Sequence, residues 1–141
     1  MFNKILVVCI GNICRSPIGE EILKQAFPNK QVSSAGLGAL VDKGADENSV
    51  QVSAVHDYDL LSHKARQITS EMIAENDLIL VMEKGHIDAI TKLAPAARGK
   101  TMLYGHWLNK EIPDPYKKSY EAFEHVYELI DKSAKEWIKR L

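Results

Sequence analysis

The sequence predicts an α/β sandwich built on a parallel β-sheet. Short apolar runs alternate along the chain with segments of helical periodicity, which is typical of strand–helix–strand units joined by right-handed crossovers. Residues 78–82 are apolar at every position, as expected of a strand buried on both faces of such a sheet. The length of 141 residues suits one domain, which we expect to span residues 1–141.

The first half of the chain is expected to hold two strands and two helices. A short apolar run begins it, a helical pattern follows, and glycines mark the loops. Proline suits the first position of a helix, where its missing N–H costs nothing. In order, we expect a strand at residues 5–8, a helix at 18–27 with Pro17 at its first position, a strand at 31–36, a loop at 37–46 and a short helix within 47–61.

The second half is expected to add two strands and to end in a long helix. Pro95 should stop one helix, and Ser119 is a suitable N-cap for the last one. That helix repeats apolar residues at steps of three and four, which favours packing on the sheet over membrane binding. In order, we expect helical turns at 69–75, a strand at 77–82, a helix at 84–93, a strand at 101–104, a loop at 105–118 and the final helix.

Composition excludes several classes of function. The net charge of −1 gives no bias toward nucleic acid, and no apolar run approaches 18 residues, so no membrane insertion is expected. The chain lacks a signal-peptide pattern, which leads us to expect a cytoplasmic protein. Its two cysteines and five histidines lack the spacing of a metal site, so we expect no metal and no cofactor.

The first strand is joined to the first helix by the segment C-I-G-N-I-C-R-S-P, residues 9–17. A tight loop that leads into a helix N-terminus binds anions, because its N–H groups and the helix dipole converge on one point. Gly11 can adopt positive φ, and Arg15 can bind two phosphate oxygens at once. Both this dipole and a guanidinium favour the thiolate of Cys9, the nucleophilic form, and the Ser16 hydroxyl can donate to that sulfur.

Residues 9–17 and the late Asp114-Pro115-Tyr116 resemble the two signatures of the low-molecular-weight protein tyrosine phosphatases. Members of that family carry a C-x5-R-S loop near the N-terminus and an Asp-Pro-Tyr element near the C-terminus. The resemblance extends over nearly the whole chain, and the two signatures together are highly specific. It implies a three-layer sandwich with a four-stranded parallel sheet and helices on both faces.

The resemblance also implies a role for each site residue. Cys9 would attack phosphorus and form a phosphocysteine, Arg15 would bind the phosphate, and Asp114 would protonate the leaving phenol. No metal is implied, since loop dipoles and the guanidinium take its place. The implied phosphate-binding residues are Ile10, Gly11, Asn12, Ile13, Cys14, Arg15 and Ser16.

Five further side chains match family positions around this loop. Asn12, Ser34 and His63 correspond to residues that hydrogen-bond together and hold the loop in its strained shape. Leu40 and Tyr116 correspond to the walls of the substrate pocket. A pocket of that depth would admit a phenyl phosphate more readily than a serine phosphate.

Leu40 stands where eukaryotic members usually have an aromatic residue. In this respect the segment 33–40 resembles the bacterial group that acts on tyrosine autokinases of polysaccharide export. The implied partner is therefore a phosphotyrosine protein, and within that class a tyrosine autokinase. Lys117 replaces the second tyrosine of the eukaryotic pattern, and Glu83 stands where many members have aspartate.

Three other functions fit parts of the same pattern. An arsenate reductase on this fold needs further cysteines, and only Cys14 is available. Phosphoarginine phosphatases of the family carry threonine where Ile13 stands, and isoleucine favours a flat phenol. A non-catalytic phosphoprotein-binding module would not need both a nucleophile and an acid. For the acid itself, Glu111 is the second candidate after Asp114, but it lacks flanking prolines.

Overall fold

The computed structural model describes residues 2–141 and contains a sheet of four parallel strands in the order β2-β1-β3-β4. The strands are β1 (Lys4–Cys9), β2 (Gln31–Gly36), β3 (Leu78–Val81) and β4 (Thr101–Leu103). Their register aligns the ends of the strands: Val8 pairs with Ala35 and Val81, and Val81 pairs with Leu103. The loops after the strands therefore meet at one edge of the sheet, where open α/β sheets bind ligands.

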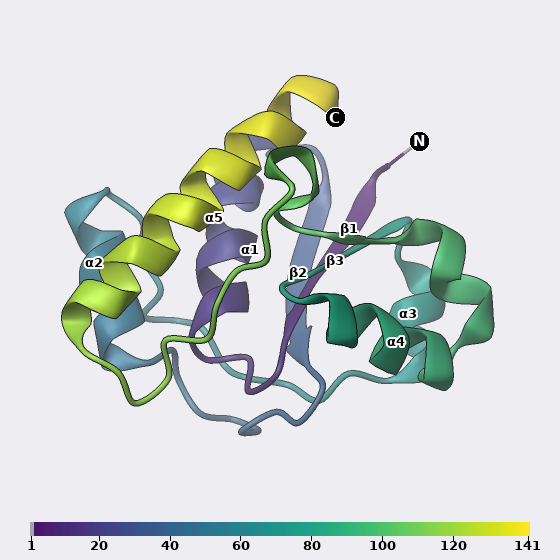
Figure 1. Ribbon diagram of the computed structural model, residues 1–141, viewed down its shortest axis with the longest axis horizontal. Helices are drawn as coiled ribbons and strands as arrows, with labels where there is room; N and C mark the ends of the chain where they lie inside the picture. Colours follow the sequence, from purple (N-terminus) through teal and green to yellow (C-terminus); the bar gives the residue numbers. More distant parts are fainter. Residues whose placement is uncertain (1) are drawn as a thin grey trace.

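Helices cover both faces of the sheet, so the predicted three-layer fold is confirmed (Figure 1). On one side lie α1 (Arg15–Ala26), α2 (Glu47–Val55) and α5 (Tyr120–Arg140), and on the other lie α3 (Ser70–Glu75) and α4 (Lys84–Leu93). Two short 3₁₀ helices, η1 (Pro95–Lys100) and η2 (His106–Leu108), flank β4.

Strand β1 has side chains in two separate cores. Ile5 and Val7 pack in the cluster formed with α1, α2 and α5, whereas Leu6 and Val8 pack in the cluster formed with α3 and α4. All four are completely buried. This position at the centre of a covered sheet explains why the strand is a continuous apolar run rather than an alternating one.

The long helix α5 begins after Ser119, whose hydroxyl accepts a hydrogen bond from the N–H of Ala122, as expected of an N-cap. Its apolar face contributes Phe123 and Ile130 to the core, and Trp137 donates its indole N–H to the carbonyl of Tyr104 at 2.8 Å. Among the helices in residues 2–141, none combines the length and the apolar character needed to cross a membrane.

Several element boundaries differ from those predicted. Helix α1 begins at Arg15, so Pro17 is its third residue and not its first. Proline is tolerated there as well, because the first four N–H groups of a helix lack intrahelical partners. Pro95 ends α4 but also opens η1, and neither 3₁₀ helix was expected. Short 3₁₀ turns give weak sequence signals, because they hold little more than one turn.

Gly19 on α1 lies against the completely buried ring of Tyr104. A Cβ atom at this position would lie 2.9 Å from Cε2 of that ring and 3.2 Å from Cγ1 of Val7. The Tyr104 hydroxyl also donates to the Gly19 carbonyl at 3.0 Å, so the ring cannot move away freely. We expect Gly19→Ala to lower the free energy of unfolding in urea by about 1–3 kcal/mol, the usual cost of overpacking a core.

Gly85→Ala is the matched control for this prediction. Gly85 is also helical, but a Cβ there would have no neighbour within 4 Å. Alanine at an exposed helical position is favoured over glycine by up to about 1 kcal/mol, so this variant should be as stable as the parent or more so. Equal unfolding free energies for the two variants would contradict the tight contact with Tyr104.

Candidate active site

The carbonyl groups of the loop between β1 and α1 accept hydrogen bonds from residues outside the loop. Main-chain N–H groups of residues 37–46 donate to the carbonyls of Cys9, Ile10, Gly11 and Ile13 at 2.8–3.0 Å. The Ser49 hydroxyl donates to the carbonyl of Cys14 at 3.0 Å. Because the peptide unit is planar and trans, the N–H that follows each of these carbonyls points the opposite way. The loop therefore turns a row of N–H groups inward, toward the N-terminus of α1.

Asn12 is the residue of this loop that adopts positive φ, at 60°; Gly11 does not, contrary to the sequence-based expectation. The side-chain Nδ2 of Asn12 donates to Ser16 Oγ at 2.7 Å and to Ser34 Oγ at 3.0 Å, and its Oδ1 accepts from the N–H of Arg66 at 2.9 Å. Asparagine tolerates the left-handed region better than most residues, and these bonds fix it there.

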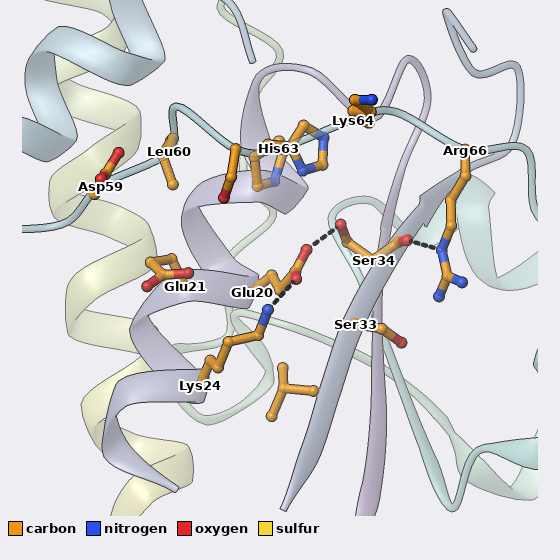
Figure 2. A pocket seen from close by; sticks show the side chains of 13 residues that line it. Glu20, Glu21, Lys24, Ser33, Ser34, Asp59, Leu60, His63, Lys64 and Arg66 are labelled. Carbon is orange, nitrogen blue, oxygen red and sulfur yellow. Dashed lines mark hydrogen bonds and ion pairs between the residues drawn. The ribbon is translucent and has the colours of Figure 1, made fainter. Parts of the chain in front are cut away.

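His63 and Ser34 lie beside the same asparagine. His63 Nε2 is 2.6 Å from the Asn12 carbonyl oxygen, so the ring donates to it. The Ser34 hydroxyl donates in turn to Glu20, whose carboxylate is also paired with Lys24 at 2.8 Å. Figure 2 shows this chain of contacts running from β2 across to α1. The sequence suggested the first two residues but gave no reason to include Glu20.

Cys9 ends β1 at the base of the loop and is almost completely buried. Its Sγ lies 2.9 Å from Ser16 Oγ, which can donate to a thiolate. The other free cysteine, Cys14, has a raised thiol pKa, chiefly because it is buried and in part because Asp46 is near. Cys14 is therefore a protonated thiol at neutral pH, the form that is the weaker nucleophile.

Arg15 is the first residue of α1 and is 1% exposed. Its Nη1 donates to Glu83 Oε2 at 2.6 Å and to the Ile112 carbonyl at 2.7 Å. Its Nη2 lies 3.8 Å from Asp114 Oδ2, and its buried Nε has no hydrogen-bond partner within residues 2–141. One edge of the guanidinium is thus fixed by the protein, while Nε and Nη2 remain available for two oxygens of an anion.

A cavity of about 170 Å³ opens above the thiol. Cys9 and Arg15 contribute to its lining, together with Leu40, Asp114 and Tyr116. Leu40 and Tyr116 are each about two-fifths exposed and form part of its rim. The cavity therefore combines a polar base with an apolar wall, an arrangement suited to an anionic group on a flat apolar ring.

Asp114 comes from the loop between η2 and α5, far along the chain from the thiol, and its side chain is 44% exposed. Its Oδ1 accepts from the N–H of Tyr116 at 3.1 Å. Glu111, the other carboxylate considered for the acid, instead accepts from the N–H of Lys84 at 2.7 Å and does not line this cavity. Asp114 is therefore the carboxylate of this loop that faces the thiol's cavity.

A second cavity of about 270 Å³ lies behind the loop, between α1, β2 and residues 59–66 (Figure 2). It is larger and mostly polar, and Glu20, Lys24, His63 and Arg66 are among its lining residues. We place the candidate site in the smaller cavity, because Cys9, Arg15 and Asp114 all line it. The larger cavity borders the residues that hold the loop from behind.

This fold and site define a class of protein, the cysteine-dependent phosphatases with an anion-binding loop at the end of the first strand. The chain belongs to the family of low molecular weight phosphotyrosine protein phosphatases, whose family model matches residues 4–141. The family, the fold and the enzyme class predicted from the sequence are therefore confirmed.

Comparison with individual relatives agrees with this assignment. The chain is 56% identical over 142 residues to the low molecular weight protein-tyrosine-phosphatase Wzb of Salmonella typhimurium, covering 100% of this chain and 95% of that protein. It is 53% identical to Vibrio vulnificus Wzb in complex with benzylphosphonate, with a TM-score of 0.97 and all of both chains covered. The YwlE arginine phosphatase of Geobacillus stearothermophilus is 26% identical, with a TM-score of 0.91 and coverage of 96% and 90%.

Proposed function

We propose that this chain hydrolyses phosphotyrosine in proteins through a phosphocysteine formed on Cys9. The observation that carries the proposal is that the Cys9 thiol lines one cavity together with Arg15, whose Nε has no partner within residues 2–141, and the carboxylate of Asp114. The inward N–H groups of the loop and the N-terminus of α1, which has no acidic residue in its first turn, favour a dianion there.

The reaction would proceed in two displacements at phosphorus. The Cys9 thiolate attacks in line, the S–P bond forms, and the P–O bond to the phenol breaks as Asp114 gives its proton to the leaving oxygen. Asp114, now ionised, then takes a proton from water. That water attacks phosphorus, the S–P bond breaks, and phosphate leaves while Ser16 donates to the departing sulfur.

The loop and its supports stabilise charge throughout both steps. Negative charge on the equatorial oxygens meets the loop N–H groups and the guanidinium of Arg15, which are already oriented before substrate arrives. Asn12, Ser34 and His63 hold the loop in that orientation through the bonds described above. Preorganised donors of this kind contribute most where water is excluded, as in this buried loop.

We propose a tyrosine autokinase of polysaccharide export, in the cytoplasm, as the physiological partner. The support is the bacterial pattern around Leu40 and the high identity to relatives named as protein-tyrosine-phosphatases. Because an arginine phosphatase is among the relatives, phosphoarginine is the second candidate substrate. Against it, Ile13 lines the cavity and offers an apolar surface rather than a hydroxyl to the group beyond the phosphate.

The selectivity of the pocket tests this proposal. The wild type should prefer phosphotyrosine peptide to phosphoserine and phosphoarginine peptides of matched sequence. Leu40→Ala removes part of the apolar wall, so it should lower kcat/KM for the aryl substrate by about tenfold, as expected for the loss of an apolar contact worth about 1–3 kcal/mol. Phosphoserine hydrolysis should change little, since that side chain is too short to reach the wall.

Two results would contradict the proposal. A wild-type preference for phosphoarginine would assign the chain to the second candidate function. An equal loss toward aryl and alkyl phosphates in Leu40→Ala would mean that Leu40 supports the loop and does not select the substrate. Val41→Ala is the matched control, because Val41 is its more exposed neighbour and does not line the cavity.

A further inference from the structure

Glu83 holds the guanidinium of Arg15 and forms a capping box with His86, in which each side chain accepts a hydrogen bond from the other residue's main-chain N–H. It is the N-cap of α4, and its side chain is 38% exposed. The oxygen that accepts from Arg15, Oε2, is also the oxygen nearest to a second side chain, His86, at 3.6 Å from Nε2. A glutamate side chain has three rotatable bonds, so this carboxylate must itself be held in place if it is to keep Arg15 in one orientation.

His86, one turn further along α4, provides this support. Its ring is buried, and Nδ1 accepts a hydrogen bond from the main-chain N–H of Glu83 at 3.3 Å. This bond puts the ring proton on Nε2, which faces the carboxylate. Burial, together with the charge of Arg15, lowers the pKa of His86, so the neutral ring that this bond requires persists at neutral pH.

Two contacts tie the segment around Ile112 to the residues at the start of α4. Glu111 accepts from the N–H of Lys84, and the N–H of Ile112 donates to the Met82 carbonyl at 2.9 Å. The main chain of Ile112, whose carbonyl is the second acceptor for Arg15, is therefore tied to Met82 just after β3, whereas the main chain of Glu83 is tied to the ring of His86.

We propose that His86 is a positioning residue for phosphate binding, which holds Glu83 at the start of α4 and through it the free edge of Arg15. This inference rests on the proposed role of Arg15 in binding the phosphate. Without the acceptor at Nδ1, the main chain of Glu83 loses its bond, only the other half of the capping box remains, and the carboxylate is held less firmly. Arg15 then keeps the Ile112 carbonyl but has a broader range of orientations.

The test compares His86→Leu with His86→Asn. Leucine keeps the buried bulk but has no acceptor, while the side-chain oxygen of asparagine can take the place of Nδ1. We expect His86→Leu to weaken inhibition by inorganic phosphate and by vanadate about tenfold, the loss expected when one hydrogen bond that supports a charged group is removed. Asparagine should recover most of that affinity. His86→Ala replaces the leucine variant if leucine prevents folding.

A double-mutant cycle decides whether His86 acts through Glu83. Glu83→Ala should weaken phosphate inhibition by itself, and adding His86→Leu to it should cause little further loss. His125→Ala is the control, because His125 is exposed and lines with Glu83 a cavity that does not include Cys9 or Arg15. It should leave phosphate inhibition unchanged.

The inference fails if the two losses add, if asparagine recovers nothing, or if His86→Leu lowers only the melting temperature without changing phosphate inhibition. Arg15→Ala separates this failure from that of the proposed function. If Arg15→Ala abolishes phosphate inhibition while His86→Leu leaves it intact, the proposed function survives and the role of His86 is overturned. If Arg15→Ala has no effect, the phosphate site itself is wrongly placed and both proposals fall.

Discussion

Cys9→Ser is expected to lower kcat toward phosphotyrosine peptide by about 10⁴-fold or more while leaving phosphate-group binding largely intact. The hydroxyl that replaces the thiol is far less acidic, and no side chain on the loop is placed to remove its proton. The inward N–H groups and Arg15 remain, so the variant should still bind substrate. Turnover and equilibrium binding of a labelled phosphotyrosine peptide measure the two effects separately.

Cys14→Ser is the matched control for this prediction. It makes the same chemical change five residues along the same loop. The Cys14 thiol, however, is kept protonated by burial, and the contact that holds the loop here is made by the Cys14 main-chain carbonyl, not by its side chain. We expect it to retain turnover within about tenfold of the wild type, a loss within the range of single buried hydrogen bonds. Turnover by Cys9→Ser at the wild-type rate, or a complete loss of turnover in Cys14→Ser alone, would show that Cys9 is not the nucleophile.

Asp114→Asn is expected to lower kcat/KM toward phosphotyrosine peptide by about 10²–10⁴-fold, the range of general acid catalysis. A tyrosine phenol has a pKa of about 10 and leaves poorly without a proton. A nitrophenol carries negative charge well, so the loss toward nitrophenyl phosphate should be much smaller. The ratio kcat/KM is the measure of choice, because it extends only to the first irreversible step, formation of phosphocysteine.

The substitution is suited to its purpose because it preserves the local structure. Asparagine retains the Oδ1 that accepts from the Tyr116 N–H, and it loses only the ability to supply a proton. Glu111→Gln is the control, since it makes the same change in the same loop on a carboxylate outside the cavity. Equal losses for both leaving groups in Asp114→Asn would show that this residue is structural, and the acid would have to be sought elsewhere.

The fold could be predicted in outline because its signals are local. A continuous apolar run such as residues 5–8 has one physical explanation in a covered sheet, and Ser119 before a periodic segment marks a helix start wherever the helix packs. Boundaries were less certain, as the start of α1 at Arg15 illustrates. The exact first turn depends on where the loop carbonyls of residues 9–13 find donors, and those donors come from residues 37–46 and from His63.

By itself the sequence determined which reactive groups the site contains: a cysteine at a strand end, an anion-binding loop and an arginine at the start of a helix, all within nine residues. Only the tertiary structure decided how these groups are held. Arg15 is fixed by partners 68 and 97 positions away, Glu83 and Ile112. Asn12 rather than Gly11 takes positive φ, because side chains and main chain from other elements bind its amide. Spacing along a chain fixes what lies within a turn or a loop, whereas the orientation of a charged group depends on partners that only packing brings together.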